Sequence, residues 1–397
     1  MGDHHRQDNE DELPSISDDL VVTKYKMASD IVNRVLKETV AKCIVGASVK
    51  ELCKWADGKL EEETGKAFKK DRKLLKGIAF PCCISRNNCI CHLSPLASDP
   101  DVLLEDGDMV KIDMGAHIDG FIAVVAHTLV VQADPNKKID GRKADALLAA
   151  HYASVAALRL VRPGKNTYTI TDCVQKIAES YSCKPVEDML SHQLEQNTIN
   201  GEKTIIQNPS EAQRKEHEKY EFGLHEVYAI DVLVSTGEGQ GRARDAKVTV
   251  FKKTDETYML KMKHSREFFT AISKKHGSMP FTLRSMENET KAKMGVVECI
   301  SHNLIEPFQV LYEKDNENVA QFKFTVLLMP NGPDKITGLP FDPETCISDK
   351  KIDDPEIQKL LASSIKNKPA KKKKKKPTTD KTNAGETASE APQLVAS

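Results

Sequence analysis

Two stretches decide the fold class of this chain: VKIDMGAHIDGFIA at residues 110–123 and EVYAIDVLVSTGEG at residues 226–239. Both are typical of β-strands, and each carries an aspartate among its apolar residues, Asp113 in the first and Asp231 in the second. The shared pattern indicates that the chain contains one structural unit twice.

A pair of predicted helices precedes each of these stretches. In both pairs a glycine loop leads to a Ser or Thr that can cap the second helix, Ser48 and Thr169. A duplicated helix–helix–sheet unit predicts an α+β fold with an internal pseudo-twofold, which would bring Asp113 and Asp231 close together. The four helices are expected at residues 30–43, 49–60, 144–161 and 169 to about 181.

The remaining segments set the expected domain boundaries. From about residue 255 to 307 the second unit is interrupted by helical patterns, which predict an inserted helical subdomain. Residues 1–20 and 349–397 are poor in aromatic residues and rich in charge, which predicts a disordered acidic N-terminus and a disordered lysine-rich tail. We therefore expect one domain over residues 21–348, with halves at about 21–140 and 141–348.

The composition argues against several classes of protein. No run of about 18 apolar residues is present, so no membrane insertion is expected. The ten cysteines include no C-x-x-C pair, which favours reduced core thiols in a cytosolic or nuclear protein. One cluster lacks the paired ligand spacing of structural zinc sites, so zinc is not predicted there: Cys82, Cys83, Cys89, Cys91 and His92.

The net charge of −1 hides an uneven distribution. Residues 242–293 carry thirteen Lys or Arg against six acids, a net of +7, and residues 350–397 carry twelve Lys against six acids, a net of +6. Residues 66–76 add six basic residues against one acid. Three basic blocks in a nearly neutral chain are typical of a protein that meets a polyanion locally, with ordinary solvated surface as the alternative for each block.

One further strand carries a basic residue at its centre. In VAQFKFTVLLMP, residues 319–330, alternating apolar side chains share one face: Phe322, Phe324, Val326 and Leu328. Lys323 lies in the middle of the other face, where burial requires a partner.

The order and number of its motifs make the chain similar to the methionine aminopeptidases of the second type, which have the pita-bread fold. The motifs KIDMGAHIDG, MLSHQL, EVYAID and AQFKFTVLL carry this resemblance, which extends over about residues 21–345 and includes the helical insertion. Further motifs, among them GRKAD, GEKTIIQNP, MPFTLR and LLMPNGP, resemble a branch of that family whose members are not peptidases. The resemblance implies a pita-bread fold for the main domain.

The peptidases of this family bind two metal ions with two Asp, one His and two Glu, which offset the metal charge while a bridging water is acidified. The resemblance assigns these ligand positions to Asp113, Val124, His192, Asp231 and Lys323. Val124 has no ligand atom, Asp231 is shorter than the family's Glu, and Lys323 replaces a bridging Glu. A lysine ammonium at this position would repel a metal cation, since two like unit charges about 4 Å apart repel by roughly 4 kcal/mol at an effective dielectric near 20.

We therefore expect no metal and no cofactor at this site. Either the Lys323 ammonium replaces the metal charge and pairs with Asp113 or Asp231, or it points to solvent from an edge strand. His92 and Asn200 stand at the positions of two substrate-contacting histidines of the peptidases. Only His92 keeps the histidine, and Asn200 departs from the pattern. The resulting interpretation is a pseudoenzyme, and the alternative is an active aminopeptidase that removes N-terminal methionine.

The basic blocks then carry the expected function. Loops that display Lys and Arg suit phosphate contacts, and the scarcity of nearby aromatic residues favours structured RNA over stacked single strands. The candidate RNA-binding residues are Lys66, Lys69, Lys70, Arg72, Lys73, Arg242, Arg244, Lys247, Lys261, Lys263, Lys371, Lys372, Lys373, Lys374, Lys375 and Lys376. The resemblance implies binding to rRNA on the large ribosomal subunit near the exit tunnel, in control of growth, translation and transcription.

The same resemblance implies cytoplasmic and nuclear locations with a nucleolar pool, and we expect a monomer. A third interpretation is an adaptor for a receptor tail and transcriptional co-regulators, with incidental RNA binding. The lysine run at 371–376 can be a nuclear address, an RNA contact or a solvated tail. The spacing of Ile357, Leu360 and Leu361 predicts a short helix, which either docks on partners or packs on the main domain.

Overall fold

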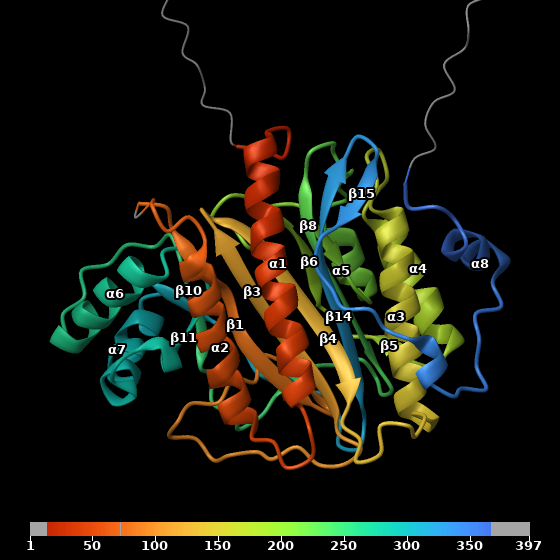
Figure 1. The fold of residues 1–397 in the computed structure, drawn as a ribbon, viewed down its shortest axis with the longest axis horizontal. Coiled ribbons are helices and arrows are strands. Elements are labelled where there is room, and N and C mark those ends of the chain that lie inside the picture. Colours follow the sequence, from red (N-terminus) through yellow and green to blue (C-terminus); the bar gives the residue numbers. More distant parts are fainter. Residues whose placement is uncertain (1–13, 72, 367–397) are drawn as a thin grey trace, which may run out of the picture. The chain divides into compact units, whose positions relative to one another are not determined.

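The computed structural model describes residues 14–71 and 73–366 (Figure 1). Its helices are α1 (Asp19–Lys42), α2 (Val49–Lys66), α3 (Gly141–Leu160), α4 (Tyr168–Ser180), α5 (Glu211–Glu216), α6 (Lys263–Lys275), α7 (Glu289–Ser301) and α8 (Pro355–Leu361), with 3₁₀ turns η1 (Leu283–Ser285) and η2 (Pro343–Thr345). Its strands are β1 (Lys76–Arg86), β2 (Cys89–Cys91), β3 (Met109–Ile118), β4 (Phe121–Val130), β5 (Lys184–Pro185), β6 (Leu190–Leu194), β7 (Thr204–Ile206), β8 (Val227–Ser235), β9 (Arg242–Ala243), β10 (Val250–Lys253), β11 (Phe281–Thr282), β12 (Ile305–Pro307), β13 (Leu311–Tyr312), β14 (Val319–Met329) and β15 (Gly332–Lys335).

The four helices expected before the aspartate strands are present as two pairs, α1 with α2 and α3 with α4. Ser48 caps α2 as predicted, because its side chain accepts a hydrogen bond from the Glu51 backbone N–H. Thr169 does not cap α4, since it already lies in the first turn of that helix. The Asn166 side chain instead accepts from the Tyr168 N–H.

The strands form one large sheet and two small ones. The large sheet has nine strands, seven of them in the order β1-β3-β4-β14-β8-β6-β7, with β15 on β14 and β5 on β8. Strands β3 and β4 form a hairpin whose two-residue turn, Asp119-Gly120, has positive φ at both positions, as a type I′ turn requires. Strands β4 and β14 are neighbours, so the two halves of the chain meet at the centre of the sheet.

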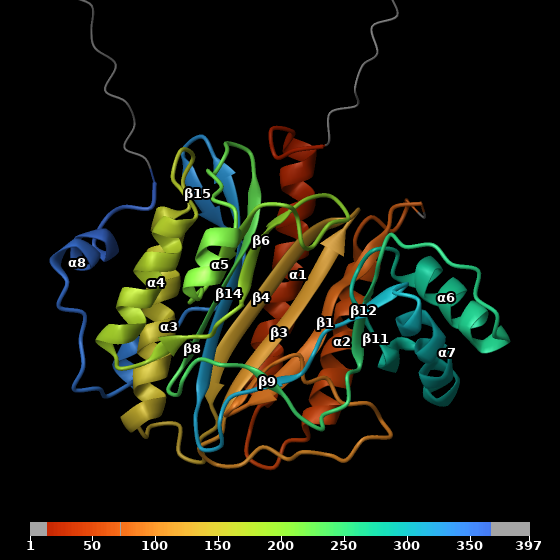
Figure 2. The same cartoon turned by 180° about the vertical axis from the view of Figure 1, so that it is seen from behind.

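Both helix pairs pack against one face of the large sheet. Figure 1 shows this helix-covered face, and Figure 2 shows the opposite face, with the strands toward the viewer. Helices α1 and α2 share a hydrophobic core with β1, β3 and β4, and helices α3 and α4 share a second core with β8 and β14. The alternating residues Phe322, Phe324, Val326 and Leu328 belong to this second core, as the strand pattern predicts. The opposite face of the sheet is therefore available for polar residues from both halves.

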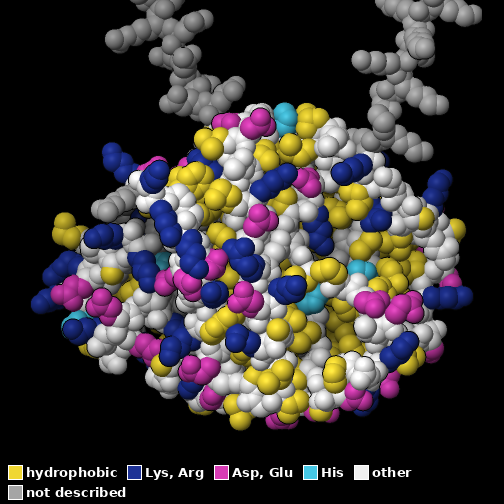
Figure 3. Space-filling view, viewed as in Figure 1, with side chains coloured by type: hydrophobic (Ala, Val, Ile, Leu, Met, Phe, Trp, Pro, Cys, Tyr) yellow, Lys and Arg dark blue, Asp and Glu magenta, His cyan; other side chains and the backbone are white. Residues whose placement is uncertain are grey.

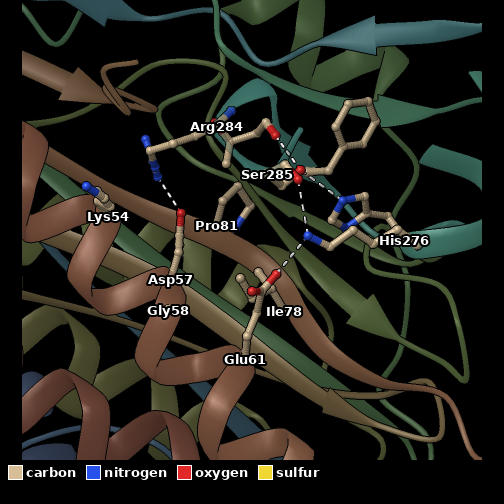
Figure 4. Close-up of a pocket in the computed structure, with 12 residues that line it drawn as sticks. Lys54, Asp57, Gly58, Glu61, Ile78, Pro81, His276, Arg284 and Ser285 are labelled. Atoms are coloured by element: carbon tan, nitrogen blue, oxygen red, sulfur yellow. Dashed lines mark hydrogen bonds and ion pairs between the residues drawn. The ribbon is translucent and has the colours of Figure 1, made fainter. Parts of the chain in front are cut away.

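The insertion contains helices, as predicted, but it also contains strands. Helices α6 and α7 pack together over a three-stranded sheet with the order β11-β10-β12. Its junction with the main sheet includes an ion pair between Arg284 of η1 and Asp57 of α2, and both side chains are nearly buried. Figure 4 shows this junction, where the exposed pair Lys275–Glu61 lies beside the buried one.

The prediction of disorder is wrong for residues 14–20 and 349–366. Ile16 is buried against the main domain and α1 begins at Asp19, while Ile352 and Ile357 are buried in the core formed with α3 and α4. A few apolar residues among many charges are sufficient because the fold supplies their partners. Helix α8 is thus a satellite of the main domain, and the rest of the predicted disorder, at 1–13 and 367–397, falls outside the described residues.

The ten cysteines are free thiols, and all are buried except Cys173 and Cys346, which are half-buried.

Among the helices that the structure describes, none combines the length and apolar character needed to cross a bilayer.

Candidate functional site

A single row of residues crosses the centre of the large sheet. Asp113 of β3 lies opposite Ala126 of β4, Ala126 lies opposite Lys323 of β14, and Lys323 lies opposite Asp231 of β8. Ile112, Met114, Phe322 and Phe324, the sequence neighbours of Asp113 and Lys323, belong to the helix-covered cores. Because side chains alternate along a strand, the charged residues of the row share the opposite face.

Lys323 pairs with both aspartates. Its Nζ lies 2.5 Å from Asp113 Oδ2 and 2.9 Å from Asp231 Oδ2, and only 14% of its side chain is exposed. Burial alone would lower the pKa of Lys323, but the two carboxylates outweigh it and raise that pKa above its usual value. The prediction that Lys323 pairs with an aspartate is confirmed, and the edge-strand alternative is wrong because β14 lies between β4 and β8.

A glutamine that the sequence analysis did not assign completes the cluster. Gln321 Nε2 lies 2.9 and 3.1 Å from the two carboxylate oxygens of Asp231 and 3.5 Å from Asp113 Oδ2. Burial raises the pKa of Asp231, and the Lys323 ammonium opposes that shift. The signal was present in the sequence, since Gln321 is two residues before Lys323 and therefore shares its face.

Val124 gives the cluster an apolar wall. It is buried on β4 opposite Gly115, and a Cβ at Gly115 would lie only 2.8 Å from Val124 Cγ1. The backbone groups of Val124 are satisfied by the Thr325 hydroxyl, which accepts from its N–H, and by the hydroxyls of Thr325 and Thr337, which donate to its carbonyl. This position thus offers no free oxygen or nitrogen to a ligand.

A cavity of about 280 Å³ opens beside the row. Its lining includes six of the seven residues that the sequence assigned to the site, all but Asp113: His92, Val124, His192, Asn200, Asp231 and Lys323. Phe80 and Phe308 form part of its apolar wall, and His92 packs against both rings. Asp113 lies just beneath, bonded to Lys323.

The two histidines of the cavity are uncharged near neutral pH. Burial lowers the pKa of each to about 4. His92 Nδ1 is 2.9 Å from the Gln309 carbonyl oxygen, whereas His192 Nδ1 is buried without a hydrogen-bond partner among the described residues. Asn200 Oδ1 accepts from Lys252 Nζ, which also pairs with Glu306 at the cavity wall. This set of groups can bind an uncharged or amphipathic group.

The residues present do not fit a two-metal centre. Lys323 Nζ stands within 3 Å of both remaining aspartates, so that a cation already bridges the two carboxylates. Val124 supplies no donor, and no group of three or more His, Cys, Asp or Glu suited to a metal occurs in residues 14–71 and 73–366. A dication placed there would meet the ammonium at short range.

The predicted RNA-binding residues do not form one patch. The block at 66–76 lies at the start of β1. Arg242 and Arg244 lie in and next to β9, which belongs to the small sheet β2-β13-β9, and β2 follows the end of β1 in the chain. The strand length places these two groups roughly 30 Å apart. Figure 3 shows Lys and Arg interspersed with Asp and Glu over α2 and α6, so this face is of mixed charge.

Several of these basic residues already have acidic partners. Lys66 lies 2.6 Å from both Glu62 and Glu63. Three others each pair with one acidic residue: Arg244 with Asp315 at 2.7 Å, Lys247 with Asp99 at 3.5 Å, and Lys263 with Glu267 at 3.7 Å. Five others are exposed: Lys69, Lys70, Lys73, Arg242 and Lys261. Arg72 and Lys371–Lys376 lie outside the described residues.

Known proteins are similar to this chain in sequence and in fold. Residues 23–232 match the metallopeptidase family M24. ErbB-3 binding protein 1 of Arabidopsis thaliana is 47% identical over 388 residues, with 96% of each chain covered. The curved DNA-binding protein of Schizosaccharomyces pombe is 42% identical over 367 residues, covering 92% of this chain and 95% of its own.

Two solved structures extend the comparison. A thermophilic Arx1 superimposes with a TM-score of 0.83 at 32% identity, covering 88% of this chain and all of its own. The methionine aminopeptidase of Thermotoga maritima gives 0.53 at 15% identity over 81% and 98%, a likeness of fold alone. The expected fold is thereby confirmed, and the expected similarity extends to a relative that is named for binding ErbB-3. The chain belongs to the metallopeptidase family M24 and has the pita-bread fold of the methionine aminopeptidases.

Proposed function

We propose that this chain is a pseudoenzyme of the methionine aminopeptidase type that binds structured RNA, above all rRNA of the large ribosomal subunit near the exit tunnel. The observation that carries the first half of the proposal is the position of Lys323, whose ammonium lies within hydrogen-bond distance of both Asp113 and Asp231. The chain's own cation offsets one of the two negative charges that would otherwise attract metal ions.

Peptide hydrolysis requires a group that activates water. Lys323 and Gln321 engage Asp113 Oδ2 and both carboxylate oxygens of Asp231, and Asp113 Oδ1 is buried without a hydrogen-bond partner among the described residues. An active aminopeptidase would need Lys323 to leave, which would expose two buried like charges to each other. This cost disfavours the alternative in which the chain removes N-terminal methionine.

The RNA-binding half of the proposal rests on exposed basic residues. Lys69, Lys70 and Lys73 are exposed just before β1, and Arg242 is exposed at the far end of that strand. Basic side chains spaced over roughly 30 Å suit the phosphates of a folded RNA, whose backbone spans such distances. The name of the curved DNA-binding relative gives independent support for a nucleic-acid partner.

The relative named for binding ErbB-3 supports a second group of partners, a receptor tail and transcriptional co-regulators. We propose that these partners act together with ribosome binding in the control of growth, translation and transcription. Cytoplasmic and nuclear pools, with a nucleolar fraction, follow from such a role. A receptor or transcription adaptor with incidental RNA binding is the competing proposal, and it predicts partner binding that survives the loss of RNA binding.

Metal content and peptidase activity test the first half. Protein purified in the presence of cobalt, manganese or zinc is subjected to elemental analysis and assayed with a methionyl peptide. We expect neither stoichiometric metal at the site nor turnover. Two bound equivalents together with turnover would overturn the pseudoenzyme proposal.

Co-sedimentation with ribosomal subunits across a salt series tests the second half. For about five phosphate contacts, log K should fall with log salt at a slope near −3.5 with single-strand coefficients and near −4.5 with duplex ones. Glutamate substitutions at the four exposed residues Lys69, Lys70, Lys73 and Arg242 should weaken binding and flatten the slope. The matched control makes the same change in net charge at four other exposed lysines: Lys137, Lys138, Lys165 and Lys215. Full binding by the first variant, or equal loss in both, would refute the assignment.

A further inference from the structure

The outer face of α7 is apolar although nothing in the described structure covers it. Met294, Val297 and Ile300, spaced three residues apart, are 51%, 64% and 38% exposed. The opposite face of the same helix is buried in the core of the insertion through Ala292, Val296 and Cys299. A helix that is apolar on both faces is typical of one that is buried on both faces.

The chain that precedes α6 extends this apolar face. Met259 and Met262 are 88% and 47% exposed. Their segment is fixed against α7, because the Glu298 carboxylate accepts from the backbone N–H groups of Lys261 and Met262 at 2.8 and 3.1 Å. The Tyr258 ring stacks on His302 at the end of the same helix. We call Met259, Met262, Met294, Val297 and Ile300 the α7 surface.

Lysines surround the α7 surface. Lys261 and Lys263 flank Met262 in the sequence, and Lys291 precedes Met294 by one helical turn, and all three are exposed. Residues 259–300, which span the α7 surface, carry eight Lys or Arg against four acids, a net of +4. In both Figure 1 and Figure 2, α6 and α7 lie at one side of the large sheet, beyond α2.

We propose that the α7 surface docks an acidic amphipathic helix of a partner protein. An apolar stripe at three-residue spacing fits the i, i+3, i+4 anchors of such a helix, and flexible methionines adapt to their shape. The basic rim pairs with carboxylates along the edges of the incoming helix. A second copy of this surface would bring two sets of positive charge together, and phosphates of RNA would leave the apolar side chains uncovered.

Different residues test this docking site and the proposed RNA binding. Lys261 and Lys263 of the basic rim are candidates for both, but the positions substituted to test ribosome binding, Lys69, Lys70, Lys73 and Arg242, lie outside the α7 surface. Variants of one site therefore leave the other intact, and each proposal can fail alone.

Fluorescence anisotropy with the full-length chain tests the proposal. The probe is a labelled helical peptide of about 18 residues, five turns, with Leu at i, i+3, i+4 and i+7 and Glu elsewhere. A matched peptide has the same Leu positions and Lys in place of Glu. We expect saturable binding of the acidic peptide and binding of the basic peptide weaker by about tenfold or more, because only the former pairs with the basic rim.

The double variant Met294→Glu/Val297→Glu should lose at least about tenfold in affinity for the acidic peptide, since both anchors lie at its centre. Its melting temperature should stay close to that of the wild type, because both side chains are exposed. Ile347→Glu, at a position 55% exposed elsewhere on the chain, is the control and should bind normally.

Several results would overturn the proposal: no binding of the acidic peptide, equal binding of the acidic and basic peptides, or unchanged binding by the double variant. An RNA hairpin that binds the wild type but not the double variant, together with no peptide binding, would assign the α7 surface to RNA instead. A crosslinker placed at Val297 in cells gives a further check, and it must capture an acidic segment with helical apolar spacing.

Discussion

Replacing Lys323 is the sharpest test of how the centre of the sheet is held together. Lys323→Met removes the ammonium and keeps most of the side-chain volume, so the effect of charge is separated from the effect of a cavity. Asp113 and Asp231 then face each other with no cation between them. Gln321 remains in place and still donates to Asp231.

The magnitude follows from the geometry. Separations of 2.5 and 2.9 Å correspond to an attraction of about 6 kcal/mol for each ion pair at an effective dielectric near 20. The desolvation of three ions offsets much of this attraction, and removal of one member of a buried pair typically costs about 3–5 kcal/mol. For a unit of about 350 residues, that loss lowers the melting temperature by roughly 4–7 °C.

The pH dependence adds a second readout. In the Lys323→Met variant, repulsion between the two carboxylates raises the pKa of one of them above its unfolded value. The folded variant then binds more protons than the unfolded chain, so its stability increases as the pH falls. Its deficit relative to the wild type should therefore shrink between pH 7 and about pH 5.

Thermal denaturation followed by circular dichroism at several pH values provides the measurement. Lys323→Met/Asp231→Asn is the matched control, because it removes one of the two facing charges and should recover part of the loss. Melting curves of Lys323→Met that match the wild type at every pH would show that the ion pairs contribute nothing. The reasoning about the charge cluster would then be wrong.

Two other buried charges give further predictions. Asp57→Asn should lower the free energy of unfolding by about 3–5 kcal/mol and increase hydrogen exchange in α6 and α7, because it leaves Arg284 buried without its anion. Its control, Glu61→Gln, breaks the exposed pair with Lys275 and should lower the free energy of unfolding by at most about 1 kcal/mol. Burial lowers the pKa of Lys111 to about 8, so this lysine alone contributes a stability that rises with pH between about pH 8 and 10, whereas the buried cysteines, whose pKa values burial raises, contribute in the opposite direction. The stability of Lys111→Met relative to the wild type should therefore fall between pH 8 and 10 in urea denaturation series, and a difference that stays constant with pH would contradict the assignment.

Local sequence patterns predicted the elements that depend on periodicity. The helix pairs, the aspartate strands and the apolar face of β14 follow from side-chain spacing alone, because each needs only its own residues to be recognised. The pairing of Lys323 was also predictable, since a lysine in the middle of an apolar strand requires a partner. The exact row through Ala126 required knowledge of which strands are neighbours.

Properties that depend on distant residues were not predictable in this way. The charge-rich segment after residue 348 suggested disorder, but Ile352 and Ile357 find a core supplied by α3 and α4. Lys66 and Arg244 looked like free phosphate contacts, although the fold brings carboxylates to both. Composition measures how much charge a segment has, whereas function depends on which of those charges remains unpaired.

The cation at the centre of the sheet is covalently part of the chain. A bound metal stabilises a protein only to the extent that the ion is available, so that its contribution varies with ion concentration and vanishes when a chelator removes the ion. Lys323 is present in every copy as soon as the chain folds, at an occupancy that no change in medium can alter. The two halves of this molecule are therefore joined without a loading step, and their assembly is independent of the cell's supply of divalent ions.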